Sequence, residues 1–103
     1  MPAVASRMDS FFKSHKELSD RVPSGVPYEL NKLHFDIASS VNRSTMAALM
    51  NLVPTSQLLF GSDYPYAQMS LTANGLDSFG LSVNDANSIN LENALLLFPR
   101  LKP

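Results

Sequence analysis

The stretch Leu58–Tyr66, LLFGSDYPY, decides the fold of this 103-residue chain. A short apolar run stops abruptly at Gly61, Ser62 and Asp63, with Pro65 two residues further on. This pattern is typical of a buried strand that emerges into a site, and it makes Asp63 the first candidate functional residue. The alternative is that Asp63 only caps the following turn, because aspartate before Tyr-Pro is favourable turn chemistry. Both interpretations stay open at this point.

Upstream of this stretch, the pattern predicts a second strand and a helix between the two strands. Residues 33–38 have apolar side chains at every second position and predict a strand. Residues 44–53 have the helical spacing of an amphipathic helix, which Asn42 or Ser44 can cap and Pro54 ends. The second strand covers 58–62. Because a helix separates the two strands, they are predicted to be parallel, which indicates the α/β class.

The flanking segments are predicted to be mainly helical. Residues 3–16 form an amphipathic stripe, and residues 20–27 are a connector rich in proline and glycine. After Tyr66, an irregular polar loop is expected to reach Gly75. Two helices should follow, a short one over 76–81 and a longer one over 83–98. Ser82 fits the capping-box position before the longer helix.

Two carboxylates follow the predicted strands, Asp36 on the first and Asp63 on the second. The carboxyl ends of parallel strands face the ligand-binding side of α/β folds, so both residues could serve one site. Asp63 could bind a divalent metal or take a proton from a metal-bound water. Asp36 could support the same site or only satisfy neighbouring backbone amides. His34 and His15 lack metal-ligand spacing, and Ser62 does not lie in a hydrolase nucleophile motif.

Composition excludes several partners. The formal net charge is −1 and the eight Lys and Arg residues are scattered, so neither nucleic acid nor an anionic membrane is indicated. No apolar run approaches the roughly 20 residues of a membrane helix, and the first residues lack the order of a signal peptide. The chain has no cysteine, which is compatible with a reducing compartment, and a cytoplasmic location is expected.

Three motifs together resemble a known family. They are LFGSDYP at 59–65, FDIA at 35–38 and NALLLFP at 93–99. The chain is similar, over about Val26–Lys102, to the C-terminal part of the amidohydrolase-related family, which includes aminocarboxymuconate-semialdehyde decarboxylase-like enzymes and decarboxylases of the 6-methylsalicylate type. The resemblance implies a (β/α)8 TIM barrel with a metal, usually zinc, in its mouth. It also implies hydrolysis or decarboxylation of small carboxylated or cyclic substrates, with Asp63 as the catalytic or metal-ligating carboxylate and a less certain role for Asp36.

The chain also departs from the family pattern. The family's histidine ligands have no counterparts here, so the remaining metal ligands are expected outside this chain. A barrel of this type takes about 250 residues, so residues 1–103 are expected to supply about the last two strands with their helices, an incomplete barrel that is inactive alone. Such a piece would expose the edges of both strands. The alternative function is therefore a non-catalytic fragment or association module that pairs its open sheet with itself or with a partner chain.

Overall fold

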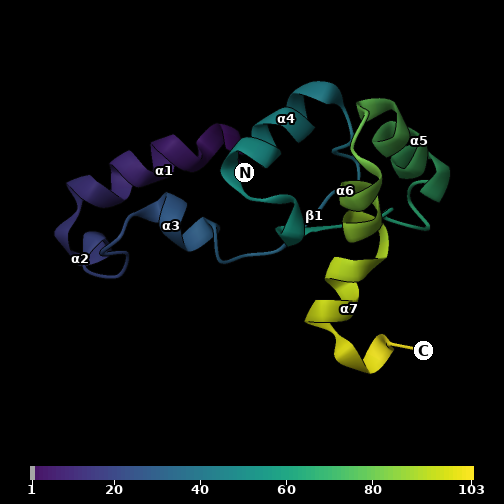
Figure 1. Cartoon of the computed structure of the whole chain (residues 1–103). Helices are drawn as coiled ribbons and strands as arrows, with labels where there is room; N and C mark the ends of the chain where they lie inside the picture. The colour runs from purple at the N-terminus through teal and green to yellow at the C-terminus, as the bar shows by residue number, and fades with distance from the viewer. Residues whose placement is uncertain (1) are drawn as a thin grey trace.

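A two-stranded parallel sheet lies at the centre of the computed structural model, which describes residues 2–103 (Figure 1). Strand β1 (Phe35–Asp36) pairs with β2 (Leu58–Leu59), so that Phe35 lies opposite Leu58. The parallel pairing agrees with the sequence pattern, but the predicted strands 33–38 and 58–62 were too long. The chain turns directly after β1, where the Ser40 N–H donates to the Ile37 carbonyl at 3.0 Å, so pairing cannot continue.

Helix α4 (Arg43–Leu52) makes the crossover between the two strands. Its N-cap is Asn42, whose side-chain oxygen accepts a hydrogen bond from the Thr45 N–H at 3.0 Å. The side chains of Met46 and Leu49 are buried, as the helical spacing predicts. The helix ends before Pro54, and the 3-10 turn η1 (Thr55–Gln57) leads into β2.

Helix α5 (Met69–Phe79) replaces most of the loop expected up to Gly75, and the short helix predicted over 76–81 is its C-terminal part. The expectation of a loop was wrong because Gly75 serves close packing rather than a turn. A Cβ atom at Gly75 would lie 2.5 Å from Cγ2 of Val41, so only glycine lets α5 approach so closely. The buried residues Thr72 and Leu76 lie on the same side of this helix.

The predicted helix 83–98 is a single helical segment with an internal change of register. It consists of α6 (Val83–Asn87), the π-helical segment η2 (Ser88–Glu92) and α7 (Asn93–Leu97). Ser82 caps α6 as predicted, because its Oγ accepts from the Asp85 N–H at 3.1 Å. Pro99 opens the final 3-10 turn η3 (Pro99–Leu101).

The N-terminal part contains three helices, α1 (Pro2–Ser14), α2 (Lys16–Ser19) and α3 (Val26–Leu30). The helix predicted over 3–16 breaks at His15, whose backbone is extended. The Ser14 Oγ donates to the Phe11 carbonyl at 2.8 Å. A side-chain hydroxyl thus bonds to one of the last backbone carbonyls of α1, where the helix ends.

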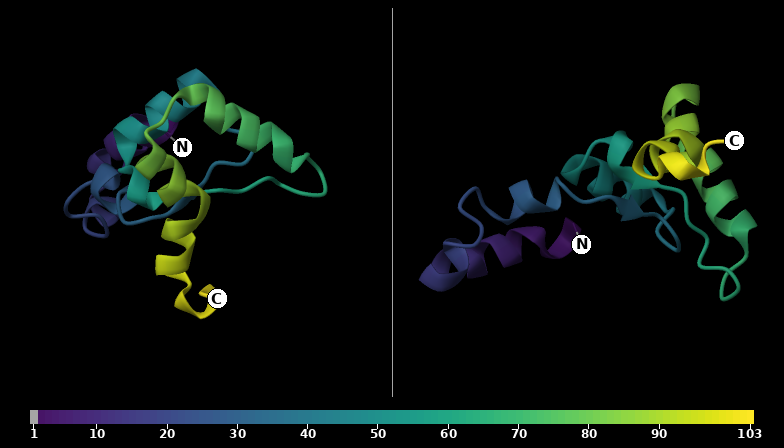
Figure 2. Two further views of the ribbon diagram at one scale, coloured as in Figure 1. Left: turned by 45° about the vertical axis from the view of Figure 1, so that its right-hand side comes forward. Right: turned by 90° about the horizontal axis from the view of Figure 1, so that it is seen from below.

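Two clusters of buried side chains hold the molecule together. The larger joins the sheet to α4, α5 and η2 and consists of Ile37, Met46, Leu49, Val53, Leu58, Leu76 and Ile89. The smaller, with Ala5, Val26 and Leu30, joins α1 to α3. The radius of gyration is 15.6 Å, against about 13 Å for a compact domain of this length, which agrees with the extended shape in Figure 2. Within residues 2–103, every helix is too short or too polar to cross a membrane.

Asp9 connects α1 to α3 and gives this connection a pH dependence. Its Oδ1 accepts from the Val26 N–H at 2.9 Å, and its Oδ2 pairs with Lys13 Nζ at 2.6 Å. The hydrogen bond from Lys13, and after it the bond from Val26, hold the pKa of Asp9 below its ordinary value of 3.8. Because the folded-state pKa is the lower one, the carboxylate stabilises the fold above pH 3.8, and this contribution is lost as the pH falls through the folded-state pKa.

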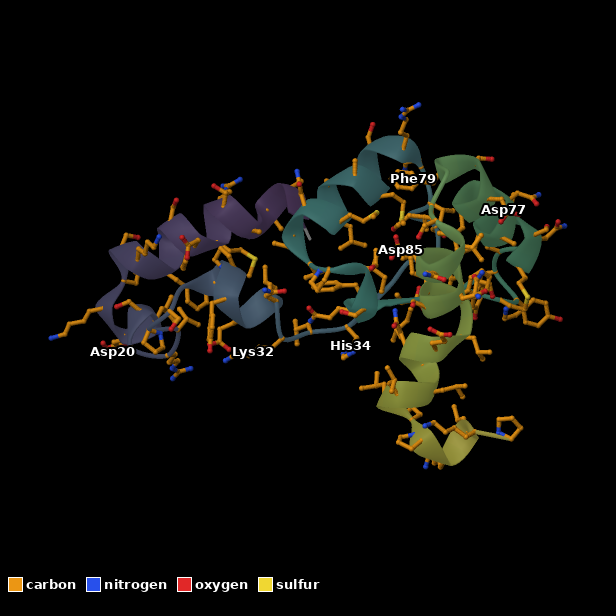
Figure 3. All side chains as sticks on the ribbon, viewed as in Figure 1. Asp20, Lys32, His34, Asp77, Phe79 and Asp85 are labelled. Atoms are coloured by element: carbon orange, nitrogen blue, oxygen red, sulfur yellow. The ribbon has the colours of Figure 1, made fainter. Side chains whose placement is uncertain are left out.

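We therefore expect Asp9→Asn to be less stable than the native chain at pH 7, with the difference shrinking steadily below pH 3.8. Urea unfolding at several pH values measures this difference. Asp20→Asn, at an exposed position (Figure 3), is the control for the loss of one negative charge. A difference between Asp9→Asn and the native chain that is the same at all pH values would contradict the expectation.

Candidate functional site

The candidate site lies at the carboxyl ends of the two parallel strands, where Asp36 ends β1 and Asp63 follows β2. The Asp36 Oδ1 accepts from the Ala38 N–H at 2.6 Å. The other oxygen, Oδ2, lies against the backbone of Gly61, so closely that a Cβ atom there would be 1.8 Å from it. The structure thus brings the Asp36 carboxylate to the start of the segment that carries Asp63.

Asp63 is exposed, and its backbone adopts the left-handed conformation with φ of 60°. Among residues other than glycine, aspartate and asparagine tolerate this conformation best. The turn that follows is closed by the backbone, since the Asp63 carbonyl accepts from the N–H groups of Tyr66 at 2.9 Å and Ala67 at 3.1 Å. Within residues 2–103, no hydrogen bond to the Asp63 carboxylate is found, so the interpretation as a side-chain turn cap is not supported.

Of the two interpretations of Asp36, the structure shows the contact that belongs to the structural one. Its bond to the Ala38 N–H satisfies a backbone amide just after β1, which was the structural alternative. Its Oδ2 faces Gly61, two residues before Asp63. The Asp36 carboxylate is therefore held against the backbone, while the side chain of Asp63 is exposed.

Neither histidine joins this site. His34 lies just before β1, is exposed and points away from the ribbon (Figure 3). The His15 Nδ1 lies 2.8 Å from the Phe11 carbonyl oxygen, and its ring packs on the Phe11 ring with centroids 4.3 Å apart. Across residues 2–103 no group of three or more His, Cys, Asp or Glu side chains is placed to hold a metal ion. A metal at Asp63 would need ligands from elsewhere.

Asn93 opens the NALLLFP motif, but no role in the site was predicted for it from the sequence. It is 3% exposed, and its Nδ2 donates to the carbonyls of Thr55 and Leu58, both at 2.8 Å. These carbonyls lie just before and within β2. Its place directly before the apolar run 94–98 is a further signal, because a polar side chain that is buried there must find hydrogen-bond partners.

The fold and site define a parallel β-α-β unit with two carboxylates at its carboxyl edge. Comparison with curated proteins gives two significant relatives, both decarboxylases. The chain is 36% identical over 72 residues to the 6-methylsalicylic acid decarboxylase of Penicillium expansum, and 35% identical over 74 residues to that of Aspergillus aculeatus. Each match covers 67% of this chain and 22% of the relative. No protein-family model and no solved structure matches the chain significantly.

The chain therefore spans about a fifth of the length of the curated relatives that it matches. Its likeness to proteins named as decarboxylases agrees with the motif resemblance of residues 35–38, 59–65 and 93–99.

Proposed function

We propose that this chain forms the C-terminal, carboxylate-bearing part of a decarboxylase-like enzyme of the amidohydrolase-related family, built as a (β/α)8 barrel. The observation that carries the proposal is the Asp63 carboxylate, which is exposed at the carboxyl end of a parallel strand. In parallel α/β folds, this end of the sheet holds the catalytic groups. The similarity to the two fungal decarboxylases supports the choice of reaction.

The chemistry of the site suits this reaction. In a decarboxylation, the bond between the ring carbon and the carboxylate carbon breaks, carbon dioxide leaves, and the ring carbon takes up a proton. Asp63 is the group that would hold and deliver this proton, while the Asp36 carboxylate lies against the backbone of Gly61 just before it. The oxygens of Asp63 also suit a divalent metal, most simply zinc, which would supply charge stabilisation when bound. Small carboxylated or cyclic acids are the substrate class.

A chimeric enzyme tests the proposal. The segment of the Penicillium expansum decarboxylase that aligns with this chain is replaced by the corresponding residues of this chain, and release of carbon dioxide from 6-methylsalicylic acid is measured. We expect the chimera to decarboxylate, while the decarboxylase without the segment is inactive. A chimera that is folded, by circular dichroism and gel filtration, but inactive would overturn the proposal.

A second candidate function is association without catalysis, through contact of the chain with a second copy of itself. One observation favours it. Large apolar side chains are exposed along the C-terminal helical segment, which projects from the rest of the molecule (Figure 1), namely Leu91, Leu96, Leu97, Phe98 and Leu101. Exposed apolar patches of this kind mark interaction surfaces. Pairing through the outer edge of β2 is not favoured, because Asn93 already occupies the Leu58 carbonyl there.

If this segment mediates self-association, Leu96→Glu should shift the purified chain toward the monomer. Leu96 is 71% exposed, so a charge at this position disturbs an interface without disturbing the core. Sedimentation equilibrium measures the effect, and Ala47→Glu on the exposed side of α4 is the matched control. A native chain that sediments as a monomer at all accessible concentrations would reject self-association.

A further inference from the structure

The edge of β2 that faces away from β1 is bonded to the C-terminal helical segment. Leu59 uses its backbone toward β1, as shown by the bond of 3.1 Å from the Ile37 N–H to the Leu59 carbonyl. Because backbone groups alternate in direction along a strand, those of Leu58 and Phe60 face the opposite edge. The expectation that both strand edges are exposed is therefore wrong for β2 over Leu58–Phe60.

The side chain of Asn93 holds the first half of this edge. Its Nδ2 donates to the Leu58 carbonyl on the strand and to the Thr55 carbonyl on the preceding turn, at 2.8 Å each. The side-chain amide of Asn93 thus donates both of its hydrogens to backbone carbonyls just before and at the start of β2. Asn93 is only 3% exposed, so water has little access to these two bonds. A substitution that removes the amide would therefore leave the carbonyls of Thr55 and Leu58 short of a hydrogen-bond donor.

The π-helical segment η2 holds the second half. In an α-helix the Asn93 N–H would donate to the Ile89 carbonyl, but here it donates to the Ser88 carbonyl, one residue further back. The Ile89 carbonyl instead accepts from the Phe60 N–H at 3.0 Å. The change of register thus supplies an acceptor to the last residue before Gly61, three residues before Asp63.

We propose that Asn93 and the π-helical segment are a positioning device, which fixes where β2 ends and so where the Asp63 carboxylate stands. The effect on catalysis rests on the proposed function of Asp63. The effect on the position of residues 61–63 does not depend on that function. Asn93 and the Ile89 carbonyl hold strand positions on both sides of Leu59, so the exit of the chain into Gly61–Asp63 has one defined direction. Asn93 is a positioning residue and touches no substrate.

The first test uses the 103-residue chain and needs no activity. Asn93→Asp preserves side-chain size but replaces the donating amide with an accepting carboxylate. We expect the Phe60 amide to exchange its hydrogen about tenfold faster, by NMR, and the amide signals of residues 61–63 to shift. Asn90→Asp, an exposed change in the same segment, is the matched control. Unchanged Phe60 exchange and unchanged 61–63 signals in Asn93→Asp would overturn the proposal.

The buried carboxylate could unfold the chain, so a second variant, Asn93→Ser, removes the amide donors without burying a charge and keeps a hydroxyl nearer the backbone. We expect an intermediate increase in Phe60 exchange, with the exchange of amides in α1 unchanged. A uniform increase over the whole chain would show a general loss of stability and contradict a positioning role.

The second test uses the chimeric decarboxylase and separates positioning from the proposed function. We expect Asn93→Ser to lower kcat about tenfold with little change in KM, because substrate contacts are kept while the carboxylate is misplaced. Leu76→Ala, which leaves a cavity in the same buried cluster but removes no hydrogen bond to β2, should lower the yield of folded enzyme but not kcat per folded molecule. An inactive native chimera would count against the proposed function only, since the exchange test judges the positioning independently. Equal kcat in Asn93→Ser and the native chimera would overturn the positioning role.

Discussion

Replacing Asp63 with asparagine in the chimeric decarboxylase is expected to lower kcat by about 100-fold or more. Asparagine has nearly the same size and tolerates the left-handed backbone of this position, so the local fold should be kept. What it loses is the ability to carry a negative charge or to hold and deliver a proton. The measurement is the release of carbon dioxide from 6-methylsalicylic acid under saturating substrate, with folding checked by circular dichroism.

Asp77→Asn is the matched control for this change. Asp77 lies on the exposed side of α5 (Figure 3), and removing its carboxylate deletes the same charge from the same chain. We expect the control to stay within about twofold of the native chimera, because an exposed charge remote from the reacting atoms contributes little to the barrier. Undiminished turnover in Asp63→Asn would remove Asp63 from the chemistry.

Gly61→Ala is expected to destabilise the chain by about 1 to 2 kcal/mol, mainly through the hydrogen bond that the displaced Asp36 carboxylate loses. The new methyl group would lie 1.8 Å from Oδ2 and 2.3 Å from Cγ of Asp36, so the carboxylate must leave its place. Its hydrogen bond to the Ala38 N–H would be lost with it. Urea unfolding followed by circular dichroism measures the free energy of unfolding.

The matched experiment removes the clashing group. In an Asp36→Ala background, Gly61→Ala should cost much less than in the native chain, because the methyl group then enters the space that the carboxylate left. A double-mutant cycle over these two changes gives the coupling directly. Strictly additive effects would mean that the Asp36 carboxylate does not occupy the space beside Gly61.

Local features could be predicted from the sequence where a residue and its hydrogen-bond or packing partner lie within a few residues of each other. The helix caps Asn42 and Ser82 could be predicted, because each side chain accepts a hydrogen bond from a backbone N–H only three residues later in the sequence. The parallel pairing followed from the length of the segment between the strands. The helix over 69–79 was missed because Gly75 is read as a loop signal when Val41, its packing partner, is not considered.

The candidate site was predicted in part for the same reason. Asp36 and Asp63 follow apolar runs, so their place at the strand ends can be inferred from neighbours in the sequence. The role of Asn93 depends on carbonyls 35 and 38 residues away, which no local pattern reveals. The π-helical register likewise involves the Phe60 N–H, which lies far from Ile89 in the sequence.

Leu52, at the end of α4, packs against both clusters of buried side chains and so links the α1–α3 part to the sheet. Few core side chains are shared between the two parts, although α1 also contacts α4. Cooperative unfolding requires that the loss of one part costs the other a large share of its contacts. We therefore expect the helices before Leu33 to unfold at lower denaturant concentration than the sheet, which would keep both carboxylates in place when those helices are lost.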